Sequence, residues 1–183
     1  MRVLGISGSL RRDSHNTELL RAAATLLPSG VEFELYDGLR DIPPYDDDAD
    51  HSQYAAVAHL KERIAAADAV LFATPEYNHS IPGQLKNAMD WVSRPLADTP
   101  LKGKPVAVIG ASTGMFGAVW AQAELRKVLA AIGAKVIDRE LPVPMADEIV
   151  RDREKLESSG THSLIVGILA ELLDQVESAK VAA

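Results

Sequence analysis

The chain has 183 residues, a length that suits one domain spanning residues 1–183. Hydrophobic residues make up 47% of it and charged residues 25%, as in soluble globular proteins, and no apolar run is long enough to cross a membrane. The formal net charge of -7 argues against a nucleic-acid partner, because binding to a phosphate backbone needs a basic surface. The absence of cysteine excludes disulfides, thiolate metal sites and cysteine nucleophiles, so any redox chemistry requires a bound cofactor.

Apolar runs that are typical of buried strands alternate with helical patterns along the chain. The expected strands cover residues 2–7, 31–35, 69–74, 105–111 and 135–137. Apolar residues at helical spacing follow each strand, marked by Leu20, Val57, Leu85, Leu125 and Ile165. Five such units predict an α/β fold with a doubly wound five-stranded parallel sheet of order 2-1-3-4-5 and helices on both faces. Ligands bind such sheets beyond the carboxyl ends of the strands, at the switch point between the first and third strands.

The stretch "GSLRRDSHNT", residues 8–17, lies at this switch point and is rich in hydrogen-bond donors. A turn that opens a helix offers free backbone N–H groups and the positive end of the helix dipole, which favour an anion. Side-chain donors come from Ser9, Ser14, Asn16 and Thr17, and Arg11 can pair with a phosphate. The alternative is that Ser14 or Asn16 only caps the helix. Neither G-x-G-x-x-G nor G-x-x-x-x-G-K-[ST] is present, so a dehydrogenase or a nucleoside-triphosphatase is disfavoured.

A hydrolase is a competing interpretation of "GASTG", residues 110–114, which matches G-x-S-x-G between a strand and a helix. Ser112 would be the nucleophile, with Asp138 or Asp147 as the acid and His162 as the base. The pattern is short and no HGGG-type oxyanion loop accompanies it, so this interpretation is the weaker one.

Other residues suggest structural roles. The five histidines show no metal-ligand spacing, so no structural metal is expected. Trp91 and Trp120 fall within helical patterns and are expected to pack rather than to stack on a cofactor. An outward helix face is expected at Gln122, Glu124, Arg126 and Lys127.

Three segments in the same order, "GSLRRDSHNT", "TPEYNHSIPGQLKNAMDW" and "ASTGMFG", resemble the NADPH-dependent FMN reductase family of quinone, azo-dye and chromate reductases. The resemblance implies a flavodoxin-like fold that binds FMN noncovalently. By motif, Ser9, Arg11, Ser14, Asn16 and Thr17 would hold the phosphate. The isoalloxazine ring would be lined by Pro75, Glu76, Tyr77 and Asn78, with Ser112 and Gly114 along its other edge.

The resemblance also implies a two-electron reaction. NADPH or NADH passes hydride to the flavin and leaves, and a quinone, azo dye, chromate or free flavin then takes its place. No side chain needs to act as an acid, base or nucleophile, so no catalytic residue is expected.

The resemblance further implies that a helix from Leu85 to Val92 would pack across a subunit boundary, giving a homodimer or homotetramer. The start at Met1-Arg2-Val3 leaves no room for a signal peptide, which predicts a cytoplasmic protein. A flavodoxin-type electron carrier remains an alternative, and the choice between NADPH and NADH and the role of His79 stay open.

Overall fold

A parallel sheet forms the centre of the protein in the computed structural model, which describes residues 1–49 and 53–181. Its strands are β1 (Arg2–Ser7), β2 (Glu32–Tyr36), β3 (Ala69–Thr74), β4 (Pro105–Ala111), β5 (Lys135–Val136) and β6 (Pro142–Val143). The strand order is β2-β1-β3-β4-β5, which confirms the predicted flavodoxin-like topology. β6 is an additional strand that pairs with the end of β4 and was not predicted.

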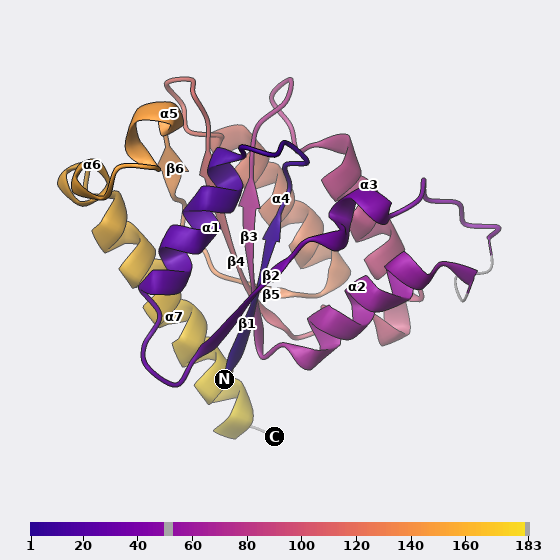
Figure 1. Ribbon diagram of the computed structural model, residues 1–183. Helices are drawn as coiled ribbons and strands as arrows, with labels where there is room; N and C mark the ends of the chain where they lie inside the picture. The colour runs from indigo at the N-terminus through magenta and orange to yellow at the C-terminus, as the bar shows by residue number, and fades with distance from the viewer. Residues whose placement is uncertain (50–52, 182–183) are drawn as a thin grey trace.

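Helices cover both faces of this sheet (Figure 1). They are α1 (His15–Thr25), α2 (Ala55–Ala66), α3 (Gly83–Val92), α4 (Val119–Ile132), α5 (Ala146–Ile149), α6 (Arg153–Ser158) and α7 (Thr161–Val181), with short 3₁₀ helices η1 (Gly38–Asp41) and η3 (Leu96–Asp98). α1 and α7 lie on one face, and α2, α3 and α4 lie on the other. Among the helices that the structure describes, none has the length and apolar character needed to cross a membrane.

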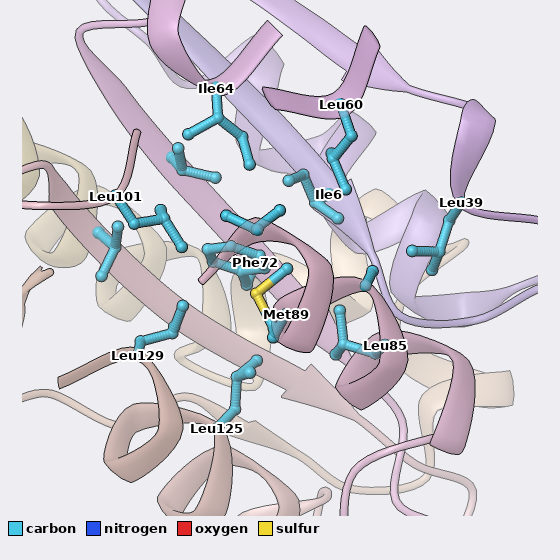
Figure 2. Close-up of a cluster of buried hydrophobic side chains, with 14 of the residues drawn as sticks. Ile6, Leu39, Leu60, Ile64, Phe72, Leu85, Met89, Leu101, Leu125 and Leu129 are labelled. Atoms are coloured by element: carbon cyan, nitrogen blue, oxygen red, sulfur yellow. The ribbon is translucent and has the colours of Figure 1, made fainter. Parts of the chain in front are cut away.

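The core consists of two apolar layers because successive side chains of a strand point to opposite faces of the sheet. In β3, Val70 and Phe72 belong to the layer under α2, α3 and α4, whereas Leu71 belongs to the layer under α1 and α7. Figure 2 shows the first layer, where Phe72 lies close to Met89 of α3. Every residue of β3 and β4 is buried. These two strands therefore give the loops that follow them a rigid base.

The carboxyl ends of parallel strands meet at one edge of a sheet. The loops after β1 and β3 accordingly lie together at the top of Figure 1, and the chain termini lie at the bottom. The loop after β4 ends at the same edge, because Gly110 in β4 is in register with Thr74 at the end of β3. The fold therefore brings the three motif-bearing segments of the sequence together.

The expected outward face of α4 needs correction at two residues, Gln122 and Arg126. Gln122 does not lie on an outward face but is completely buried, where its Nε2 donates to the Gly117 carbonyl at 3.1 Å and its Oε1 accepts from the Leu141 amide at 3.1 Å. Arg126 is also largely covered, because its guanidinium pairs with Glu140. Trp91 is a core residue, as expected, and Trp120 packs against the rings of His79 and Phe116 with 42% of its surface exposed. Gln122 turns inward because the buried backbone groups of Gly117 and Leu141 need partners there.

Candidate functional site

One pocket lies between the loops that follow β1, β3 and β4. It is lined by Ser9, Arg11, Ser14, His15, Asn16, Pro75, Glu76, Tyr77, Ala111, Ser112 and Thr113. Of the residues expected to bind a cofactor, the structure therefore brings Ser9, Arg11, Ser14, Asn16, Pro75, Glu76, Tyr77 and Ser112 together at this pocket. Thr17, Asn78 and Gly114 do not line it.

The amino terminus of α1 forms the end of the pocket that suits an anion. Ser14 is the N-cap of the helix, and its Oγ accepts a hydrogen bond from the Thr17 amide at 3.2 Å. The first amides of α1, those of His15 and Asn16, have no acceptor within the helix. The buried Nδ1 of His15 also has no hydrogen-bond partner among the described residues. With the Arg11 side chain beside them, the two backbone amides fit a phosphate group.

Asn16 and Thr17 have framework roles that the sequence did not reveal. The Asn16 Nδ2 donates to the Ala111 carbonyl at 2.9 Å, and its Oδ1 accepts from the Ala111 amide at 2.9 Å. Both ends of this buried amide are therefore used in joining α1 to the end of β4. The Thr17 hydroxyl donates to the Ser7 Oγ at 3.0 Å, which ties the first turn of α1 to the end of β1. These side chains hold the anion-binding turn in place.

The loop after β3 contains a tight two-residue turn. The Tyr77 amide donates to the Ser80 carbonyl at 3.0 Å, and the Ser80 amide donates to the Tyr77 carbonyl at 3.1 Å. Asn78 and His79 between them have φ values of 54° and 61°, the left-handed conformation that such turns require at both central positions. The turn carries Asn78 away from the pocket and leaves Tyr77 at its edge with 51% of its surface exposed.

Glu76 links the loop after β3 to α4. Its Oε2 accepts hydrogen bonds from the amides of Trp120 at 3.1 Å and Ala121 at 3.2 Å. α4 needs this acceptor because its own N-cap residue, Ala118, has no side chain that could cap the helix. The other oxygen of Glu76 lies 3.6 Å from the Nδ1 of His79, whose ring packs edge-on against Trp120. We call this link from Glu76 to α4 the Glu76 clasp.

The loop after β4 is held by β6. The Ser112 amide donates to the Val143 carbonyl at 3.0 Å, and Gly117 has a φ of 56° where a Cβ would lie 2.5 Å from the Val143 nitrogen. The Ser112 Oγ accepts from the Gly114 amide at 3.1 Å, so Gly114 supports the loop although it lies outside the pocket.

The residues of the hydrolase interpretation are not assembled. His162 lines a different cavity, beside Ala22 and Leu156. Within residues 1–49 and 53–181, no hydrogen bond joins Ser112 to Asp138, Asp147 or His162. Without a neighbouring base, the Ser112 hydroxyl has nothing to activate it as a nucleophile.

Sequence reasoning did not select His15 and Thr113, which also line the pocket. His15 follows the capping residue directly, so it occupies the first helical position, where the backbone amide faces any bound anion. That register was available from the capping signal at Ser14. Thr113 had no comparable signal, since its place depends on how the loop after β4 is attached to β6.

Comparison with known proteins agrees with this geometry. Residues 1–148 match the model of a family described as NADPH-dependent FMN reductase. An NAD(P)H-dependent FMN reductase of Pseudomonas aeruginosa is 51% identical over 130 residues, which cover 70% of this chain and 69% of that protein. A quinone reductase of Escherichia coli K12 is 40% identical over 141 residues, covering 76% and 74% of the two chains.

Among solved structures, the flavoenzyme NAD(P)H:(acceptor) oxidoreductase FerB from Paracoccus denitrificans superposes with a TM-score of 0.83 at 37% identity, and the match covers 97% of each chain. The match to the family model extends over most of the chain and includes all three loops of the pocket. The chain therefore belongs to the NADPH-dependent FMN reductase family and is an oxidoreductase that uses FMN and NAD(P)H.

Proposed function

We propose that this protein transfers two electrons from NADPH or NADH to quinones by a ping-pong mechanism, in which donor and acceptor use the same face of one bound FMN in turn. The observation that carries the proposal is the pocket between three loops at the switch point of the sheet. Relatives named quinone reductase favour quinones as acceptors. We also propose azo dyes, chromate and free flavin as electron acceptors of this enzyme.

Bound FMN supplies the chemistry, because its ring can take up a hydride and release it again. The residues of this chain bind and orient the cofactor. The amides at the start of α1 and the Arg11 side chain would hold its phosphate, and the loops that carry Tyr77 and Ser112 would border its ring. The Glu76 clasp and the contacts of β6 fix the distance between those two loops, which is how a protein positions two reactants for hydride transfer.

Steady-state kinetics with NADPH and a benzoquinone tests the shared site. When each is varied at several fixed concentrations of the other, the double-reciprocal lines are expected to be parallel. Intersecting lines would show that donor and acceptor are bound together and would contradict the mechanism. If FMN-loaded protein reduces no quinone with either NADPH or NADH, quinone reduction itself is wrong, and the electron carrier becomes the better interpretation.

The Ser112→Ala variant distinguishes the reductase interpretation from the hydrolase interpretation. The variant is expected to keep most of its quinone reductase turnover, because hydride transfer needs no nucleophile. A serine hydrolase would lose nearly all activity on this change and would react with a fluorophosphonate probe in the wild-type form.

A homodimer or homotetramer in the cytoplasm completes the proposal. Its support is a group of exposed apolar side chains beside the pocket: Tyr77, Met115, Phe116 and Trp120 are between 42% and 83% exposed. Exposed patches of this kind usually mark contact surfaces. The face of α3 that carries Leu85 and Met89 is buried in the chain's own core, so the second subunit would contact α3 through its other face. Light scattering of the purified protein gives the subunit number.

A further inference from the structure

Four arginines gather around a second cavity on the β2 side of the loop after β1. Arg11, Arg12, Arg21 and Arg40 all line it, together with the hydroxyl-bearing residues Ser7, Ser9, Thr17 and Tyr36. We call it the arginine cavity. It encloses about 220 Å³. A water molecule takes up only about 30 Å³ in the liquid, so the cavity has room for a phosphate group.

The charges in the arginine cavity are poorly balanced within the protein. Arg21 forms an ion pair with Glu18 at 2.5 Å, and Asp37 is the one carboxylate among the lining residues. Arg40 donates to the Leu10 carbonyl, which carries no net charge. In the described part of the chain, neither Arg11 nor Arg12 forms an ion pair or a side-chain hydrogen bond. All four arginines are exposed, so solvent screens their mutual repulsion, and a bound anion would offset what is left of it.

Tyr36 also lines the arginine cavity. It is 5% exposed, and its hydroxyl has no hydrogen-bond partner among the described residues. Burial, followed by the charges of Asp37 and Asp41, raises the pKa of Tyr36 to about 12. Tyr36 is therefore neutral at pH 7 and adds no negative charge to the cavity lining.

The arginine cavity adjoins the pocket between the loops after β1, β3 and β4, which we call the flavin pocket because we propose that FMN binds there. Ser9 and Arg11 line both, so the two cavities meet across the loop after β1. The FMN phosphate has its own donors at the start of α1, which face the flavin pocket. The adjoining cavity is thus placed to take a different phosphate, carried by a molecule that reaches the flavin.

We propose that the arginine cavity binds the 2′-phosphate on the adenosine of NADPH and so makes this enzyme prefer NADPH to NADH. The inference rests on the proposed function, in which the nicotinamide of the donor lies over the flavin. NADPH and NADH differ only in this phosphate, a doubly charged group that arginine binds in a bidentate manner. Arg12 is the specificity residue, because Arg11 also lines the flavin pocket, Arg21 is paired with Glu18, and Arg40 donates to the Leu10 carbonyl.

Calorimetric titration of FMN-loaded protein with adenosine 2′,5′-bisphosphate and with adenosine 5′-monophosphate tests the site directly. The wild type is expected to bind the bisphosphate about tenfold more tightly, as one hydrogen bond to a charged group allows. Arg12→Ala should bring the two affinities together, and the charge reversal Arg12→Glu should weaken the bisphosphate further. The matched control is Lys135→Ala, which removes an exposed positive charge at the start of β5, far from the loops. It should change neither affinity.

Steady-state kinetics with NADPH and with NADH provides a second test of the arginine cavity. Arg12→Ala is expected to raise the KM for NADPH about tenfold and to leave the KM for NADH and both kcat values within about twofold. Equal affinity of the wild type for the two adenosine phosphates overturns the proposal. So does an Arg12→Ala variant that binds FMN more weakly and the bisphosphate normally, because the cavity would then serve the flavin phosphate. If no quinone is reduced at all, the proposed function fails while the titrations still decide the arginine site.

Discussion

Arg11 lines both cavities, and it is the arginine that the loop after β1 contributes to the proposed flavin pocket. Hydrogen bonds to charged groups contribute about 1.5–3 kcal/mol, so Arg11→Ala is expected to weaken FMN binding about 10- to 150-fold. Quenching of flavin fluorescence during titration of the apoprotein measures the change. Arg12→Ala is the matched control and should leave the FMN dissociation constant within about twofold. An unchanged constant for Arg11→Ala would remove this side chain from the phosphate site.

Single residues also show where the sequence was informative and where it was not. The capping role of Ser14 could be predicted, because a hydroxyl before a helical pattern has one common use. The sequence could not show whether the side-chain amide of Asn16 binds a phosphate or supports the fold. Its partner Ala111 is 95 residues away in the sequence, and only the assembled sheet brings the two residues together. The prediction that Gln122 faces outward was wrong for the same reason, since its hydrogen-bond partners belong to loops that the sequence pattern does not position.

At the level of elements, the Glu76 clasp joins two loops that each depend on a different strand. Replacing Glu76 with Ala leaves the Trp120 and Ala121 amides without an acceptor and is expected to lower the free energy of unfolding by about 1 kcal/mol, the usual cost of a lost cap. FMN binding should weaken as well, because the loops lose their fixed separation. Glu76→Gln keeps an acceptor oxygen and should retain most of both properties. Urea denaturation and flavin titration of the two variants provide the comparison. Equal losses in Gln and Ala variants would show that the charge, and not the clasp, is what matters.

The strands and major helices were predictable because their apolar periodicity is set by the two-layer core. β6, by contrast, has only two residues, one of them Pro142, and carries no periodicity of its own. It becomes a strand because the end of β4 leaves backbone groups that need partners. Short elements that complete a sheet are therefore the part of this fold that a pattern cannot supply.

For the molecule as a whole, the end of α7 is attached to the beginning of β3. The Lys180 Nζ lies 2.8 Å from Asp68, whose carboxylate also accepts a hydrogen bond from the Arg2 amide at 2.7 Å. The bond from Lys180, with that from Arg2, lowers the pKa of Asp68 below its ordinary value. A depressed carboxyl pKa contributes stability that is present above the unfolded pKa of about 4 and is lost as the pH falls through the folded pKa.

Asp68→Asn is therefore expected to lower the Tm at pH 7, and the difference from the wild type should shrink steadily below about pH 4. Thermal unfolding followed by circular dichroism at several pH values shows the trend. Glu177→Gln, on the exposed side of α7, neutralises a carboxylate that has no such partners among the described residues, and it should shift the Tm little at any of these pH values. A Tm difference for Asp68→Asn that persists unchanged in acid would contradict the linkage.

The division of the β4 edge between β5 and β6 has a consequence for solubility. An uninterrupted edge strand is a template on which other chains can add, and this is a common route to aggregation. Here β5 pairs only with Pro105 and Val106, and β6 only with Gly110 and Ala111, so two pieces of two residues each replace one long strand. At the opposite edge, β2 carries Glu32 and Glu34, both paired with arginines. β6, which supports the loop after β4, thus also leaves this side of the sheet without a continuous edge strand to which other chains could add.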